Sequence, residues 1–97
     1  MYVVRNVFKC KAGEAKHLVT KFKSVFDVMQ EHGFNNPRIM TDTVANYWTV
    51  VFEVEVETPG AYFDATDNMP REDDRMKGMD GYMDHVESGY REIFKVE

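Results

Sequence analysis

Hydrophobic and polar side chains alternate along several short segments of this chain, and a period of two residues predicts β-strands. Residues 2–9 form the first such segment, and their even-numbered row is the more apolar one. Residues 47–57 alternate over the longest stretch, which predicts a half-buried central strand. The apolar row of that strand consists of Trp48, Val50, Phe52, Val54 and Val56. Two more strands are predicted at residues 38–44 and from Val86 to the end of the chain.

A spacing of three and four residues between apolar side chains predicts helices in the rest of the chain. Residues 13–32 show this spacing most clearly. The pair Thr58 and Pro59 is typical of a helix start, which predicts a second helix over residues 60–67. Residues 71–84 predict a third helix, which two internal glycines weaken.

The predicted order of elements is β-α-β-β-α-(α)-β, the ferredoxin-like arrangement of the α+β class. Ninety-seven residues allow one domain, so we assign residues 1–97 to a single unit. We expect a four-stranded antiparallel sheet with its helices on one face. Residues 2–9 and 47–57 should form the central pair, with the last strand beside the first.

Charge and cysteine content remove several classes of partner. Twelve basic against seventeen acidic side chains give a net charge of −5 without a basic stripe, so neither nucleic acid nor an anionic membrane is expected as a partner. The single Cys10 excludes an intrachain disulfide, and no metal or phosphate-loop motif is present. We therefore predict no metal and no cofactor. No signal peptide or transmembrane run is recognisable, which predicts a cytoplasmic protein.

The sheet face opposite the helices is predicted to be half apolar. Its expected members are Val3, Arg5, Val7, Lys9, Thr49, Val51, Glu53, Glu55, Arg91, Ile93 and Lys95. One interpretation is a solvated face with cross-strand ion pairs. The other is a surface that packs against a two-fold copy of itself, because a part-apolar face of alternating charge is self-complementary.

The helix-facing row of the sheet is apolar, but Asn6, Tyr90 and Glu92 are predicted to share it. A buried amide or carboxylate needs a partner, and polar groups that converge in an apolar cleft are typical of a small-ligand site. Alternatively, Asn6 and Glu92 bond each other or the backbone, and no ligand binds. Met79 and Met83 likewise either line an adaptable pocket or pack in the core.

Four segments carry a resemblance to a known family. They are FKCKAGEA at residues 8–15, WTVVFE at 48–53, TPGAYF at 58–63 and REIF at 91–94. With these segments the chain resembles the dimeric α+β barrel superfamily, in particular its antibiotic-biosynthesis-monooxygenase-like (ABM-like) and NIPSNAP-like members. That superfamily includes cofactor-free oxygenases of aromatic substrates, haem-degrading oxygenases and isomerases. The resemblance implies a homodimer whose sheets pair back to back, with a ligand between the sheet and the helices.

The resemblance also implies a function: binding of a small apolar or aromatic ligand, with cofactor-independent oxygenation or isomerisation of an aromatic or polyketide-like compound. In this interpretation Asn6 polarises a carbonyl or phenolate oxygen, and Glu92 or His85 moves a proton. The expected ligand-binding residues are Trp48, Phe52, Tyr90, Phe94, Met79 and Met83. The alternative is a non-enzymatic dimeric module with a closed pocket, so the sequence leaves open whether the protein is an enzyme.

Haem binding is a further alternative that the resemblance raises. Asn6 matches the strand asparagine of the haem-degrading branch, and His85 is roughly placed for its histidine. The helix tryptophan of that branch is missing, because Ala65 stands at the corresponding position. We therefore do not expect haem, and we predict that His85 is a partly exposed residue where the third helix hands over to the last strand.

Overall fold

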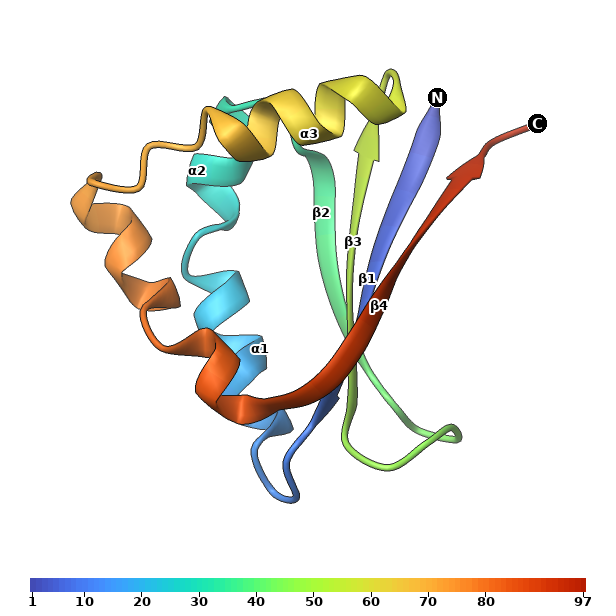
Figure 1. Ribbon diagram of the computed structural model, residues 1–97, viewed down its shortest axis with the longest axis vertical. Coiled ribbons are helices and arrows are strands. Elements are labelled where there is room, and N and C mark those ends of the chain that lie inside the picture. Colours follow the sequence, from blue (N-terminus) through green and yellow to red (C-terminus); the bar gives the residue numbers. More distant parts are fainter.

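A four-stranded antiparallel sheet forms one layer of the computed structural model, which describes residues 1–97 (Figure 1). The strands are β1 (Tyr2–Cys10), β2 (Asn35–Thr41), β3 (Thr49–Val56) and β4 (Val86–Lys95), and their order across the sheet is β2-β3-β1-β4. The central pair is β1 and β3, and β4 lies beside β1. The predicted ferredoxin-like α+β fold is therefore confirmed.

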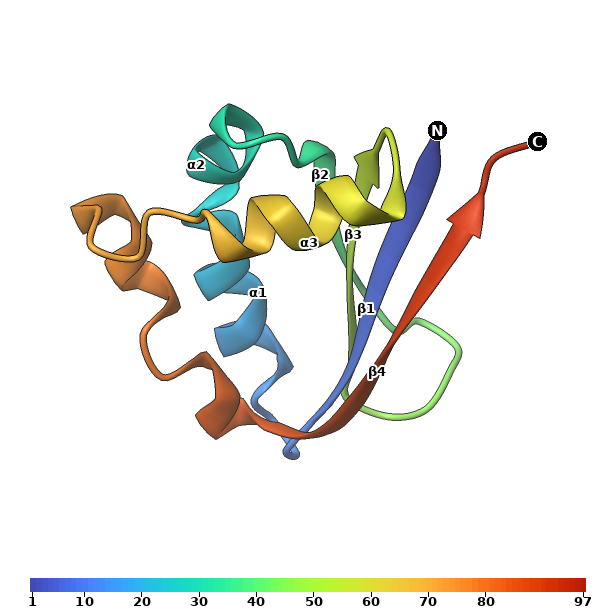
Figure 2. The same cartoon turned by 45° about the horizontal axis from the view of Figure 1, so that its top comes forward.

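The helical segments form the second layer, on one side of the sheet (Figures 1 and 2). They are α1 (Ala15–Lys23), α2 (Phe26–Glu31), α3 (Pro59–Asp67) and two short 3-10 helices, η1 (Asp74–Met79) and η2 (Tyr82–His85). Thr58 caps α3 as predicted, because its side-chain oxygen accepts a hydrogen bond from the Ala61 amide at 3.1 Å. None of these helices has the length and apolar character needed to cross a bilayer.

Two of the predicted helices are broken into shorter ones. The single helix expected over residues 13–32 is divided at Ser24 and Val25 into α1 and α2. The Ser24 hydroxyl donates to the Lys21 carbonyl at 2.6 Å, a local bond that competes with the helical ladder, and the β-branched Val25 takes a non-helical conformation. The helix expected over residues 71–84 becomes η1 and η2, because Gly81 adopts a left-handed φ of 74° between them.

The strand boundaries at the β2–β3 connection also differ from the prediction. β2 begins three residues earlier than expected and ends at Thr41, and β3 begins at Thr49. Trp48 has a positive φ of 62°, which a strand residue does not adopt, so Trp48 belongs to the loop. The gap of two residues expected between the predicted strands 38–44 and 47–57 is thus a longer connection over residues 42–48.

The orientation of β4 is the main correction to the predicted sheet. Asn6 lies opposite Phe52 of β3 and opposite Arg91 of β4, so Arg91 and Ile93 face the helices. Glu92 lies opposite Arg5 on the other face. The prediction that Tyr90, Glu92 and Phe94 face the helices is therefore wrong, and so is the reverse placement of Arg91, Ile93 and Lys95. The prediction assigned the more apolar row of β4 to the helical side, but that row lies on the outer face.

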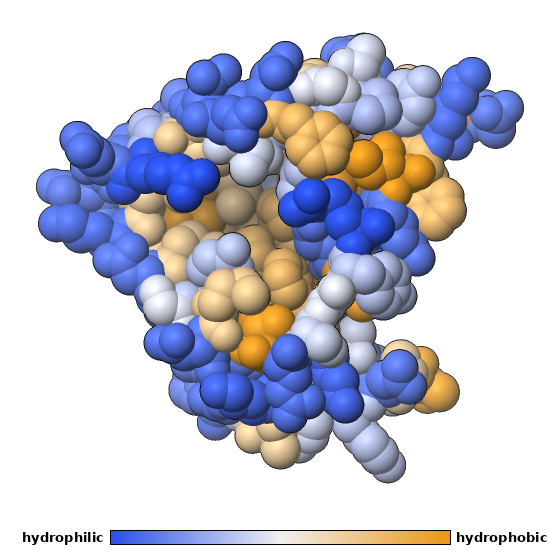
Figure 3. All heavy atoms as spheres, in the orientation of Figure 1, coloured by the Kyte–Doolittle hydropathy of each residue, from blue (hydrophilic) through white to orange (hydrophobic).

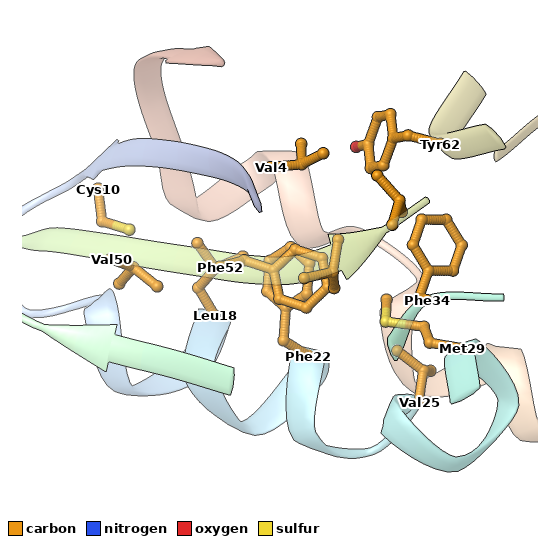
Figure 4. Packing of buried hydrophobic residues seen from close by; sticks show 12 residues of the cluster. Val4, Cys10, Leu18, Phe22, Val25, Met29, Phe34, Val50, Phe52 and Tyr62 are labelled. Carbon is orange, nitrogen blue, oxygen red and sulfur yellow. The ribbon is translucent and has the colours of Figure 1, made fainter. Parts of the chain in front are cut away.

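The core lies between the two layers (Figure 4). From the helical layer, including the break between α1 and α2, it receives Leu18, Phe22, Val25 and Met29, and from the sheet Val4, Val50, Phe52, Val54 and Val56, all of them buried. The rings of Phe22 and Phe52 stack with their centroids 4.6 Å apart. This packing fixes α1 on the sheet, and it leaves the space beneath α3, η1 and η2 less completely filled.

Candidate ligand-binding cleft

A cleft with a volume of about 460 Å³ opens between the sheet and the segment that runs from α3 to η2. Figure 3 shows it as a hollow with hydrophobic walls and hydrophilic residues around its rim. The walls include Phe8, Phe22, Phe52, Met76, Met79 and Tyr82. A hollow of this size with predominantly apolar walls and a few polar groups is typical of a site for a small organic molecule.

Three polar side chains on three different elements meet in this cleft. Arg91 of β4 donates from Nε to Asn6 Oδ1 of β1 at 2.7 Å. Asn6 in turn donates from Nδ2 to the Tyr62 hydroxyl of α3 at 3.2 Å. A guanidinium group only donates, so the amide oxygen of Asn6 must face Arg91 and its NH2 group must face Tyr62. The hydroxyl of Tyr62 therefore accepts from Asn6 and keeps its own proton for another acceptor.

The guanidinium of Arg91 is also held by aromatic rings. Its central carbon lies 5.1 Å from the ring centroid of Tyr62 and 5.7 Å from that of Phe63. A cation over the face of an aromatic ring is attracted by the ring quadrupole. Together with the bond to Asn6, these contacts fix the side chain of Arg91 at the cleft. Asn6 itself is only 7% exposed, so its orientation is determined by these partners.

Comparison with solved structures gives likenesses over the full chain. An uncharacterised NIPSNAP domain protein from Burkholderia xenovorans is 11% identical, with a TM-score of 0.79 over 100% of this chain and 95% of that chain. An antibiotic biosynthesis monooxygenase is 10% identical, with a TM-score of 0.71 over 100% and 99%. A variant of MhuD, whose crystal structure holds two manganese protoporphyrin IX molecules per active site, is 14% identical, with a TM-score of 0.73 over 99% and 94%.

The chain has the ABM-like and NIPSNAP-like fold. No family model and no curated protein sequence matches it. At these identities the likeness establishes the fold, and the family resemblance predicted from the sequence is confirmed at that level. The likeness does not assign a function to the cleft.

Three of the predicted site residues line the cleft: Asn6, Phe52 and Met79. Three others lie away from it. Tyr90 and Phe94 are 61% and 51% exposed, and they share the outer face of the sheet with Glu92. The expected pairing of Asn6 with Glu92 is therefore wrong, and Arg91 takes the place that was assigned to the carboxylate.

The remaining predicted residues also lie outside this cleft. Met83 is exposed on η2. Trp48 is 42% exposed and borders a separate hollow beside α1, together with Tyr47 and Ala15. The alternation in residues 47–57 placed Trp48 in the inner row, but its left-handed backbone turns it out of the strand.

His85 is half-buried at the end of η2, in agreement with its predicted position between the third helical segment and the last strand. Its Nδ1 lies 3.1 Å from Glu14 Oε1, and its ring stacks on His17 at 5.3 Å. These contacts direct His85 toward the start of α1, away from the cleft. Nearby, burial and to a lesser extent Glu14 raise the pKa of the Cys10 thiol, which makes Cys10 a weak nucleophile.

Sequence reasoning missed Tyr62 and Arg91, which are two of the three side chains in the hydrogen-bonded chain at the cleft. A usable signal for Tyr62 was the start of α3: once Thr58 is the cap, Tyr62 lies one turn into the helix. Arg91 had no such signal in its own strand, because only the register of β4 with β1 places it on the helical side of the sheet.

Proposed function

We propose that the protein binds a small aromatic or polyketide-like molecule in the cleft and polarises a carbonyl group of that molecule through Tyr62. The observation that carries this proposal is the ordered chain of hydrogen bonds from Arg91 through Asn6 to Tyr62, which ends at a free donor inside an apolar hollow. The apolar walls hold the ring system and exclude water. Both effects strengthen a hydrogen bond from Tyr62 to the ligand.

The chemistry that follows is enolisation. A donor aimed at a carbonyl oxygen stabilises the charge that develops there when a neighbouring carbon loses a proton. Asp80 is the one carboxylate among the residues that line the cleft, and we assign it the role of proton acceptor. The enolate either regains the proton at another carbon, which is isomerisation, or reacts with dioxygen without a cofactor. In the second case it gives one electron to dioxygen, the resulting carbon radical and superoxide combine into a C–O bond, and the protonated peroxide loses water to leave a new carbonyl group.

The alternative of a non-enzymatic module requires a pocket that is packed shut. A cleft of about 460 Å³ beside Asn6 supports ligand binding over that alternative. The fold likeness to an antibiotic biosynthesis monooxygenase supports the same class of ligand, at the level of fold alone. We propose a reducing cytoplasm as the compartment, because the single cysteine is buried and free.

Anthrone, an aromatic ketone with an acidic CH2 group, is a suitable probe. Under argon in D2O, the protein should accelerate exchange of the CH2 protons, which NMR measures directly. Tyr62→Phe should slow this exchange by about a hundredfold or more, because general acid catalysis contributes that much. Tyr47→Phe is the matched control, since Tyr47 is exposed and outside the cleft.

Oxygen uptake by the same mixture in air then separates the two reactions. Exchange accompanied by oxygen consumption indicates an oxygenase, and exchange without it indicates an isomerase. The proposal fails if the wild-type protein exchanges anthrone protons no faster than buffer, or if Tyr62→Phe is as active as the wild type.

We also propose that the outer face of the sheet packs against a second copy of the chain. The orientation of β4 places Tyr90 opposite Val7 and Phe94 opposite Val3, so this face is more apolar than the sequence suggested. Its one buried carboxylate, Glu53, is already neutralised. Arg38 donates to it from Nε at 2.8 Å, and Arg5 Nε lies 3.5 Å from its other oxygen.

Light scattering after size exclusion tests the dimer. We expect twice the 11.3 kDa mass of one chain at micromolar concentration. Val51→Lys, in the middle of the outer face, should give the monomer because it adds a charge where apolar side chains would pack. Val44→Lys is the control, since Val44 lies in the exposed loop after β2. A wild-type mass near that of one chain would refute the proposal.

A further inference from the structure

The five arginines of the chain fall into two groups. Arg5, Arg38 and Arg75 all form ion pairs, with Glu53 or with Glu31 and Asp73. Arg71 and Arg91 form none, and both line the cleft. The chain carries seventeen acidic against twelve basic side chains, so carboxylates are in excess. The two arginines without a carboxylate partner are therefore concentrated where a ligand would bind.

Arg91 is arranged to receive an anion. Its Nε is occupied by Asn6, and no protein group bonds its two terminal nitrogens. The rings of Tyr62 and Phe63 lie under the guanidinium and restrict its movement. The two terminal nitrogens of a fixed guanidinium form a fork that matches the two oxygens of a carboxylate.

The charge of the cleft as a whole favours an anion. Its lining contains two positive residues, Arg71 and Arg91, and one negative residue, Asp80. The lining thus carries a net charge of 2 − 1 = +1 in a chain whose net charge is −5. Arg71 lies in the segment between α3 and η1 and Arg91 lies in β4, so the two cations occupy different walls of the hollow.

From these observations we infer that the ligand carries a carboxylate, that Arg91 is the anchor of this group, and that the apolar walls hold the attached ring. The inference rests on the proposed function and narrows it from aromatic compounds in general to aromatic acids. Arg71 adds positive potential from another part of the lining. The bond from Arg91 to Asn6 then has a second consequence: the carboxylate is held next to the group that orients Tyr62.

Naphthalene-2-carboxylate and naphthalene-2-carboxamide form a matched pair of probes, since they share ring and shape and differ in charge. Titration of each into the 15N-labelled protein, followed by NMR, gives the affinity and shows which residues respond. We expect the carboxylate to bind between about tenfold and a hundredfold more tightly than the amide, as a charge-assisted hydrogen bond provides. The Nε–H signal of Arg91 should shift with the carboxylate.

Two variants test the anchor. Arg91→Gln should reduce the preference for the carboxylate to about twofold or less, and Arg91→Lys should retain part of it because a lysine keeps the charge without the fork. Lys23→Gln is the control: it makes the same change in net charge on an exposed side chain of α1 that does not line the cleft, and it should leave the preference unchanged.

The outcomes separate this inference from the proposed function. Equal binding of both probes in the cleft overturns the carboxylate inference and leaves ring binding intact. Failure of both probes to shift any cleft residue overturns ring binding and the inference with it. A preference that survives Arg91→Gln, or that Lys23→Gln lowers equally, shows that Arg91 is not the anchor. If Arg91→Gln does not fold, the wild-type affinity ratio and the Arg91 Nε–H shift still decide.

Discussion

Replacing Asn6 separates a structural role of the polar cluster from a functional one. Asn6 is buried and bonds two side chains, so both roles predict that its loss matters, but they predict different results for different substitutions. Asn6→Ala removes the hydrogen bonds and leaves a space. Asn6→Leu removes the same bonds but restores apolar contact in a side chain of similar reach, next to a cleft that can accommodate it.

The expected loss of stability depends on whether water can replace Asn6 as the hydrogen-bond partner of Arg91 and Tyr62. A neutral hydrogen bond contributes about 1 kcal/mol and one to a charged group about 1.5–3 kcal/mol. Arg91 is exposed and the Tyr62 hydroxyl borders the cleft, so water replaces Asn6 at both, and we expect Asn6→Ala to cost about 1–2 kcal/mol. In a domain of this size that lowers Tm by about 5–15 °C. Burial of a leucine contributes about 1.5–3 kcal/mol, which offsets the loss in Asn6→Leu.

Calorimetry and the anthrone exchange assay, applied to both variants, distinguish the roles. If Asn6 orients Tyr62 for chemistry, Asn6→Leu keeps a Tm within a few degrees of the wild type and loses exchange activity as fully as Asn6→Ala does. Such a gain or retention of stability with loss of activity is expected where a buried polar group serves function. Wild-type exchange activity in Asn6→Leu would refute this reasoning, because Tyr62 would then need no amide to orient it.

Two further predictions concern the segment over the cleft. Hydrogen bonds from Arg75 hold the pKa of Glu31 and the pKa of Asp73 below their usual range. The contacts of Arg75 with these two carboxylates therefore stabilise the fold above the unfolded pKa values, and this stability is lost as pH falls through the lowered, folded pKa values. Tm of Arg75→Gln should consequently depend less on pH than Tm of the wild type between neutral pH and about pH 3. Gly78→Ala should lower Tm, because the added Cβ atom would lie 2.1 Å from Ser24 Oγ. A second substitution, Ser24→Gly, should restore the Tm in the double variant. An unchanged Tm in Gly78→Ala alone would contradict the close approach.

The parts of the fold that the sequence predicted are those that one local pattern determines. The alternation in β1 and β3 places Val4 beside Val54 and Phe8 beside Val50, and both pairs follow from a period of two. The cap at Thr58 likewise defines α3 within one residue. Where a local side-chain bond competes with the helical ladder, as at Ser24 between α1 and α2, the sequence predicted a single longer helix.

The face assignment of β4 could not be obtained from its own pattern. Hydrophobicity selects a row in a strand only when one face is buried and the other is wet. In β4, Tyr90 and Phe94 form the more apolar row, yet the inner row holds Gly89, Arg91 and Ile93. Only the register with β1 shows which row meets the helices, because each odd-numbered residue of β4 pairs with an even-numbered residue of β1, as Arg91 does with Asn6. Because the wrong row of β4 was assigned to the helical side, Glu92 was also wrongly predicted as a site residue.

The two rows of β4 connect the two proposed surfaces. β4 is an edge strand, joined to the sheet through β1 alone. Its outer row presents Tyr90 and Phe94, which we propose to be covered by a second copy, and its inner row presents Arg91, which we propose to hold the ligand. Because alternate residues of one strand supply both surfaces, packing on the outer face would also restrict the backbone that positions Arg91 against Asn6. If a second copy covers the outer face, the apolar character of this row, which misled the sequence assignment, follows from the same strand arrangement that forms the cleft.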